Sequence, residues 1–137
     1  MRKIILIVTL FLSGIFMLSC LENERVDNIY YTMKPIDSVD IQAVNGLNEV
    51  TEIKTYYTRN SECEDFFNFD YKGFDMERRV AIVTWNIDDV NCAEISEATH
   101  AILRFKPLNR GEYTFKFWKG NNDENQPEYI EKTIIIP

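Results

Sequence analysis

Histidine, glycine and proline are scarce in this sequence of 137 residues, which contains one, five and four of them. His100 is the only imidazole, so a zinc site built on histidine lacks its second ligand and a Ser-His-Asp triad has one candidate base. The sequence has no Gly-x-Ser-x-Gly elbow, no glycine-rich phosphate loop and no His-Glu-x-x-His motif. We therefore expect no catalytic residue, no metal and no cofactor, and we predict that the protein is not an enzyme.

Cysteine is also scarce, and none of the three cysteines forms a Cys-x-x-Cys pair, which gives a structural zinc site little support. Cys63 and Cys92 lie in polar stretches rich in turn residues. In an exported protein such a pair is predicted to form a disulfide, and two free thiols are the alternative. The bond would close a loop of about 30 residues, which chain entropy values at roughly 3 to 4 kcal/mol.

A long apolar run is missing, because residues 4–18 fall short of the roughly 20 that a membrane-spanning helix needs. This run follows a basic start and ends at a small residue, as a cleaved secretion signal does. The segment 16–20, Phe-Met-Leu-Ser-Cys, resembles a bacterial lipobox, in which the chain is cut before the cysteine and that residue, Cys20, is lipidated. Met17 replaces the usual leucine, and an ordinary signal peptide is the alternative.

The lipobox resemblance implies a membrane partner, reached through a lipid anchor. The acidic segment 21–25 loosely resembles the tags that send lipoproteins of Bacteroidetes-type bacteria to the cell surface, although a solvated tether explains it equally well. The expected location is therefore the outer membrane, on its periplasmic or its surface face. The expected organisation is a signal peptide at 1–19, a lipidated cysteine and tether at 20–35, and one domain at 36–137.

Positive charge is in deficit once the signal is removed, because 13 Lys and Arg then face 22 Asp and Glu, a net charge of −9. An acidic surface repels phosphate groups, so no nucleic-acid partner is expected. The 118 residues after position 19 suit one domain with a single core.

Helical periodicity and internal repeats are absent, whereas alternation of apolar and polar residues is common. One helical turn at 93–97 is the only helical expectation. The alternation predicts an all-β, seven-stranded antiparallel sandwich. The predicted strands are 38–43, 50–57, 66–71, 79–87, 101–106, 113–118 and 129–136.

The segment 103–115, Leu-Arg-Phe-Lys-Pro-Leu-Asn-Arg-Gly-Glu-Tyr-Thr-Phe, resembles the corner between strands E and F of immunoglobulin-like and fibronectin type III domains. Tyr113 stands where these families place a tyrosine that hydrogen-bonds back across the corner. The resemblance implies an immunoglobulin-like sandwich with Trp85 as its buried core tryptophan, but Cys63 and Cys92 do not stand at the positions of that family's disulfide. Residues 113–136 also resemble the tails of small uncharacterised lipoproteins from Bacteroidetes-type bacteria, and neither likeness implies an activity.

Candidate ligand-binding residues are few. Trp118 falls on the strand face opposite the apolar series that starts at Tyr113, where an exposed indole suits a sugar ring and burial under a neighbour is the alternative. Asp88, Asp89 and Asp123 lie in oxygen-rich loops that suit calcium, although they lack the EF-hand spacing and are also explained as solvated loops.

These features favour an envelope-anchored, non-enzymatic binding or interaction module whose ligand is a protein or a glycan. Two alternatives remain open. One is a glycan-binding accessory lipoprotein of an outer-membrane uptake system, which depends on the compartment and on Trp118. The other is an acidic inhibitor of a cationic enzyme, which depends on net charge and size alone.

Overall fold

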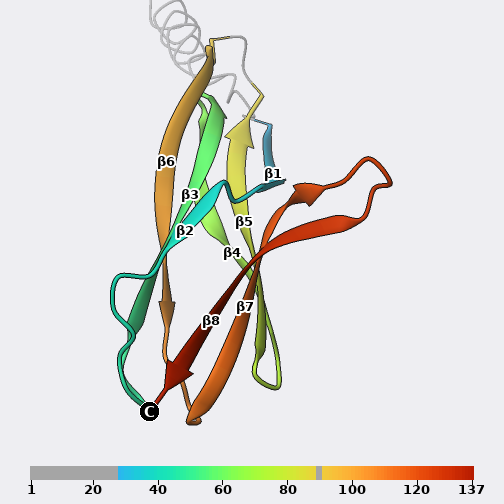
Figure 1. Ribbon diagram of the computed structural model, residues 1–137. Coiled ribbons are helices and arrows are strands. Elements are labelled where there is room, and N and C mark those ends of the chain that lie inside the picture. The colour runs from blue at the N-terminus through green and yellow to red at the C-terminus, as the bar shows by residue number, and fades with distance from the viewer. Residues whose placement is uncertain (1–27, 89–90) are drawn as a thin grey trace, which may run out of the picture.

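The computed structural model describes residues 28–88 and 91–137 and shows an all-β protein (Figure 1). The predicted signal peptide, Cys20 and Asp89 lie outside the described residues. Within the described ranges no helix is long and apolar enough to cross a membrane. The eight strands found there are β1 (Ile29–Lys34), β2 (Ser38–Asp40), β3 (Thr51–Ser61), β4 (Glu64–Phe74), β5 (Glu77–Ile87), β6 (Glu94–Phe105), β7 (Gly111–Asn121) and β8 (Pro127–Ile136).

The strands form two open sheets, a smaller one in the order β2-β3-β6 and a larger one that contains β1, β4, β5, β7 and β8. In the larger sheet, β4 pairs with almost the whole length of β5. Because β4 occupies one edge of β5, the other edge is shared: β1 pairs there with residues 82–87 and β7 pairs with residues 77–80. Between these two segments, beside Ala81, β1 and β7 separate. We call this point the fork, and beyond it the β7–β8 hairpin projects away from the sheets (Figure 1).

The core lies between the sheets, where alternating side chains of facing strands meet. In β7 the alternate residues Tyr113, Phe115 and Phe117 are buried, and the Phe105 ring lies 4.9 Å from the rings of both Tyr113 and Phe115. Full burial of such side chains contributes about 1.5 to 3 kcal/mol each. The buried apolar cluster consists of Ile36, Ile53, Tyr57, Val80, Ile82, Ala101, Leu103, Phe105, Tyr113, Phe115, Phe117, Ile134 and Ile136.

At the end where β5 finishes, the interior of the sandwich is polar instead. Lys34, Glu64, Thr84 and Asn86 are all buried there, and we call them the polar interior cluster. The Glu64 carboxylate binds Lys34 Nζ at 3.0 Å, accepts a hydrogen bond from Thr84 Oγ1 at 2.9 Å, and accepts another from the Asn60 N–H at 2.8 Å. Burial raises the pKa of Glu64, but these hydrogen bonds outweigh it and leave the pKa below its ordinary value. Buried charges require such complete pairing.

The corner between β6 and β7 contains the contact that the resemblance implied. The Tyr113 hydroxyl donates a hydrogen bond to the Asn109 carbonyl at 3.1 Å and accepts one from the Asn109 N–H at 3.3 Å. These two hydrogen bonds join Asn109 in the corner to Tyr113, four residues later, near the buried start of β7. Tyr113 therefore both fills the core and fixes the path of the chain around it.

Several sequence predictions need correction. The described residues contain eight strands rather than seven, and the β5–β7 pair is parallel, so the arrangement is not wholly antiparallel. Residues 29–34, expected in the tether that ends at residue 35, form β1 because β5 offers them an unpaired edge. The helical turn expected at 93–97 is wrong, since pairing with β3 extends β6 back to Glu94.

Candidate functional site

The outer face of the larger sheet carries apolar side chains at the end where the interior is polar. In β5, Thr84 and Asn86 are buried, so the alternation of a strand directs Trp85 between them to the outer face. The interpretation of Trp85 as a core residue is therefore wrong, and its side chain is half-buried. Antiparallel pairing places Tyr31 opposite Trp85 and Met33 opposite Val83 on this face.

A bulge in β4 adds a further ring to this face. The register between β4 and β5 shifts between Phe66 and Asn68, so one extra residue, Phe67, interrupts the alternation. Phe66 and Phe69 consequently share the inner side, with ring centroids 5.0 Å apart, and both pack against the core. The ring of Phe67 instead lies 4.6 Å from that of Tyr31.

These side chains form a continuous surface, which we call the outer aromatic face. Its most exposed members are Ile29 at 56%, Tyr31 at 58%, Met33 at 46% and Phe67 at 53%. Single exposed apolar residues are ordinary on protein surfaces, whereas a contiguous patch marks an interaction site. Besides those four residues, the outer aromatic face includes Val83, Trp85, Trp118 and Tyr129.

At the fork the outer face sinks into a hollow of about 320 Å³. The small side chain of Ala81 lies at its centre, because the β5 position opposite Asp70 carries no larger group. Trp118 and Tyr129, which are opposite each other in the β7–β8 hairpin, form one wall. The side chains of Met33 and Arg79 also line it. The hollow therefore joins two half-buried aromatic rings to polar groups from the neighbouring strands.

The Trp118 indole is held by its own hairpin. Its Nε1–H donates a hydrogen bond to Asn121 Oδ1 at 3.0 Å, and the Asn121 amide donates to Asn125 Oδ1 at 3.0 Å. A register shift between Trp118 and Gly120 marks a second bulge, where Gly120 has φ of 115°. Other residues adopt that backbone conformation only with strain, so the glycine permits the bend that brings the hairpin across the fork.

The charged groups around the hollow are paired with one another. Asp70 Oδ2 lies 3.0 Å from Lys72 Nζ, and Arg79 Nε lies 2.7 Å from Glu77 Oε1. Glu77 Oε2 also binds Lys116 Nζ at 2.8 Å. Hydrogen bonds from Lys116 and from Arg79 lower the pKa of the Glu77 carboxyl, and the same bonds raise the pKa of Lys116 and of Arg79. Each of these five charged groups around the hollow therefore has a partner of opposite charge.

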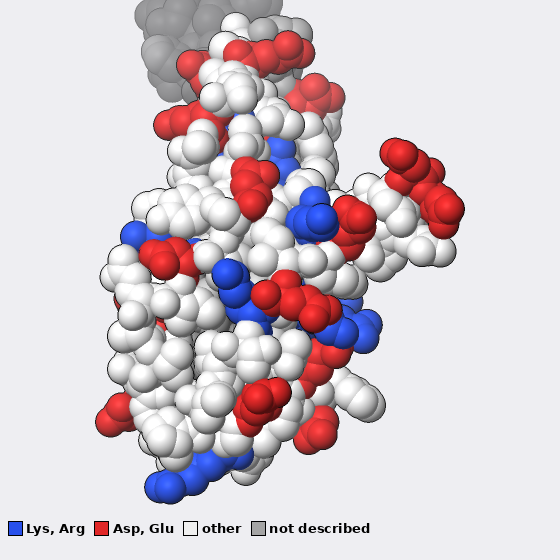
Figure 2. All heavy atoms as spheres, viewed as in Figure 1, with Lys and Arg blue, Asp and Glu red and all other residues white. Residues whose placement is uncertain are grey.

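The structure separates the acidic residues proposed as calcium ligands. Asp88 is exposed beyond the end of β5, where its N–H donates to the Asn28 carbonyl, while Asp123 is exposed in the loop at the tip of the projecting hairpin. Figure 2 shows the acidic tip well apart from the rest of the molecule. In the described ranges no group of three or more His, Cys, Asp or Glu side chains is placed to hold a metal.

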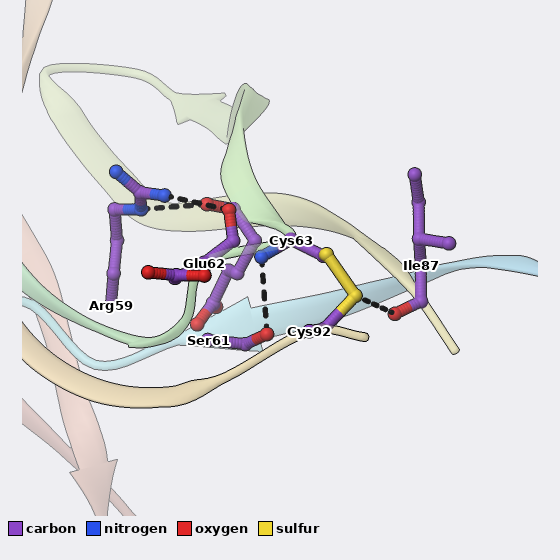
Figure 3. The surroundings of a disulfide bond; sticks show 7 residues. Arg59, Ser61, Glu62, Cys63, Ile87 and Cys92 are labelled. Carbon is purple, nitrogen blue, oxygen red and sulfur yellow. Dashed lines mark hydrogen bonds between the residues drawn. A yellow bond between two sulfur atoms is a disulfide. The ribbon is translucent and has the colours of Figure 1, made fainter. Parts of the chain in front are cut away.

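Cys63 and Cys92 form a disulfide with a Cα–Cα distance of 5.5 Å, as the sequence predicted (Figure 3). The bond joins the turn between β3 and β4 to the segment before β6, at the end where the interior is polar. The turn is also held by Arg59, whose Nε donates to the Glu64 carbonyl at 2.6 Å and whose guanidinium donates to the Glu62 carbonyl at 3.1 Å. The disulfide therefore closes the end of the sandwich where the interior is polar.

Comparison of the chain with protein-family models, with curated proteins and with solved structures found no match. The class of the protein is therefore defined by its structure only. It is a two-sheet, disulfide-linked all-β protein with an exposed aromatic face and a hollow at its fork. Sequence reasoning proposed Trp118, which lies on this face, but it named neither Tyr31 nor Met33 nor Phe67. The alternation of residues 29–34 contains a signal for Tyr31 and Met33. The outward position of Phe67 depends on the bulge in β4, which no sequence pattern predicts.

Proposed function

We propose that this protein is an envelope-anchored, non-enzymatic binding module that uses the outer aromatic face. The observation that carries the proposal is a local inversion of the usual sheet pattern. On the outer side Trp85 lies between Tyr31 of β1 and Asp65 of β4, and the Tyr31 ring contacts the exposed ring of Phe67. Directly behind them Glu64 and Thr84 make the inner side polar. Folding alone favours the reverse, because apolar side chains are stabilised by burial. Departures from that rule concentrate at functional sites.

The anchor and the location are part of the same proposal. The lipobox-like segment at 16–20 supports lipidation of Cys20, and the Cys63–Cys92 bond fits an oxidising compartment such as the bacterial envelope. Labelling of cells with a fatty-acid analogue tests the anchor. The full chain should incorporate the label, and Cys20→Ala should not. Incorporation that survives in Cys20→Ala would contradict lipidation at this residue.

The finer fold assignment also belongs to this proposal. The two sheets and the Tyr113 hydroxyl bonded to Asn109 support a relationship to immunoglobulin-like domains. The parallel pairing of β5 with β7 departs from a wholly antiparallel sandwich. We therefore propose that the domain is a variant of the immunoglobulin-like fold, with β5 rather than β4 beside β7. Such sandwiches commonly present ligand sites on strands and loops, but the fold by itself assigns no activity.

Retention of envelope components by the immobilised full chain tests the binding role. The informative variant is Tyr31→Ser/Phe67→Ser, which removes the two exposed rings that contact each other. The matched control is Ile102→Ser/Leu108→Ser, which removes two exposed apolar side chains from the smaller sheet and from the β6–β7 corner. We expect the control to retain the same components as the natural chain and the aromatic variant to lose at least one of them. Identical retention by all three proteins would overturn the proposal.

The acidic-inhibitor alternative gains no comparable support. On the face that Figure 2 shows, acidic and basic side chains are interspersed rather than gathered into one acidic patch. Several carboxylates are also paired with a cation of this chain, among them Glu52 with Arg104 and Glu128 with Lys119. Attraction of a cationic enzyme requires a field of one sign over a surface, and paired charges weaken such a field.

A further inference from the structure

The hollow at the fork has the size of a small-molecule site. Its volume of about 320 Å³ lies at the lower end of the roughly 300 to 1,000 Å³ that is typical of ligand pockets. Ala81 forms the floor and leaves space above β5, while Trp118 and Tyr129 present flat apolar surfaces at one side. A ligand with one flat apolar face suits this lining.

Planar polar groups surround this aromatic wall. The Asp70 carboxylate, the Arg79 guanidinium and the Asn121 amide come from three different strands and all line the hollow. Together they offer donors and acceptors in the same space, which matches hydroxyl groups because each hydroxyl both donates and accepts. The two aromatic rings add contact area at a low cost in conformational entropy, since each has only two side-chain torsions.

The charge balance favours a neutral ligand. The charged groups that line the hollow already have partners, because Asp70 binds Lys72 and Arg79 binds Glu77. A phosphate or carboxylate would have to compete with these carboxylates for the two cations. A ligand with hydroxyl groups needs no such exchange, since it can add hydrogen bonds to the groups as they stand.

We propose that the hollow binds a pyranose ring of a neutral polysaccharide, a proposal that rests on the binding function of the outer aromatic face. One apolar face of the ring lies on Trp118, and its hydroxyl groups contact Asp70, Arg79 and Asn121. From Met33 at the edge of the hollow, the outer aromatic face continues to Tyr31 and its contact partner on β4. This continuation gives neighbouring rings of a polymer further apolar surface, and so predicts tighter binding of a hexasaccharide than of a monosaccharide.

Tryptophan fluorescence makes the site directly observable. The chain has two tryptophans, so Trp85→Phe leaves Trp118 as the single reporter, inside the hollow. This full-length variant is titrated with maltohexaose, cellohexaose, laminarihexaose, xylohexaose and mannohexaose, and with polygalacturonate as an anionic probe. We expect a change in the emission of Trp118 with at least one neutral hexasaccharide. The dissociation constant should change less than twofold between 50 and 500 mM NaCl, because no net charge is neutralised.

Two variants that act in different ways locate the binding. Trp118→Ala removes the platform, and Ala81→Leu fills the floor while it keeps both aromatic rings. Both are measured by calorimetry with the hexasaccharide that binds, and each should weaken binding at least tenfold. Leu108→Ala, which removes an exposed side chain that does not line the hollow, should leave the affinity unchanged. A cooperative urea transition confirms that each variant is folded, and Trp118→Phe replaces Trp118→Ala if the latter is not.

The outcomes separate this inference from the broader proposal. Neutral hexasaccharide binding that Trp118→Ala and Ala81→Leu both weaken supports the inference. It is overturned if no hexasaccharide binds, if only polygalacturonate binds, or if the variants bind as tightly as the natural chain. Where it is overturned and Tyr31→Ser/Phe67→Ser still loses an envelope component, a peptide or protein ligand takes the place of the polysaccharide and the binding function stands. Where that loss is also missing, both fail.

Discussion

The buried ion pair between Lys34 and Glu64 gives the sharpest stability prediction. In Glu64→Gln the side chain keeps its shape but loses its charge, so Lys34 faces a neutral amide inside the sandwich. The natural carboxylate accepts bonds at both oxygens, from Lys34 and Thr84 at one and from the Asn60 N–H at the other. An amide can accept at one of these positions only, and its NH2 group must face a donor at the other.

The expected cost is about 3 kcal/mol. Removal of one partner from a buried ion pair typically costs about 3 to 5 kcal/mol. The lower end applies here because the Lys34 side chain keeps 11% of its area exposed and so retains some contact with water. With a urea dependence of about 1 to 3 kcal/mol per molar, this loss moves the unfolding midpoint down by between about 1 and 3 M.

Equilibrium urea unfolding of the full chain at pH 7, followed by tryptophan fluorescence, measures this change. Glu52→Gln is the matched control, since it breaks an ion pair with Arg104 in which both side chains are more than half exposed. Exposed pairs contribute from 0 to about 1 kcal/mol. The double variant Lys34→Met/Glu64→Gln removes both charges and should be more stable than Glu64→Gln alone, because no unpaired charge remains buried. A Glu64→Gln midpoint that matches the control, or a double variant less stable than the single one, would refute the reasoning.

Three further predictions concern pH, the disulfide and the corner. The pKa of Glu64 in the folded chain lies below its unfolded value of about 4.3, so the unfolded chain binds more protons at this residue. The free energy of unfolding therefore falls as the pH drops through the folded pKa. Urea unfolding between pH 7 and pH 3 should show a smaller fall in stability for Glu64→Gln than for the natural chain. Cys63→Ser/Cys92→Ser, which opens a loop with a sequence separation of 29, should lose about 3 to 4 kcal/mol, and an unchanged urea midpoint after reduction of the natural chain would contradict this. Tyr113→Phe removes both hydrogen bonds to Asn109 and should cost about 1 to 2 kcal/mol, whereas Tyr129→Phe, a change on the outer face, should cost less than half of that in the same assay.

The strands of the second half were predictable from the sequence because each has one clearly apolar side. In β7 the alternation of Tyr113, Phe115 and Phe117 with polar residues fixes which side is buried, and the structure buries those three rings. Pairing between distant strands was not predictable. No local pattern shows that β5 pairs with β7 in parallel, because this depends on which edge of β5 remains after the β4–β5 hairpin has formed.

The candidate site was predictable only in part, and β5 shows why. Alternation put Val83 and Trp85 on one side, and the resemblance to immunoglobulin-like domains suggested that Trp85 was the buried core tryptophan. In the structure the opposite face of β5 is buried, because the Thr84 hydroxyl donates a hydrogen bond to the buried Glu64 carboxylate. Sequence patterns report which residues share a face, but they do not report which face is buried when both are partly apolar.

The polar interior cluster and the outer aromatic face are therefore two sides of one feature. A one-residue shift in the register of β5 at this end would bury Trp85 and expose Thr84. Hydrophobic burial alone would favour that arrangement. The shift would also leave Glu64 and Lys34 without their partner on β5, and the cost of unpaired buried charges opposes that change. The Cys63–Cys92 bond adds stability to the same end. The ion pair and the disulfide thus allow the sheet to keep its aromatic side in solvent, as the proposed binding role requires.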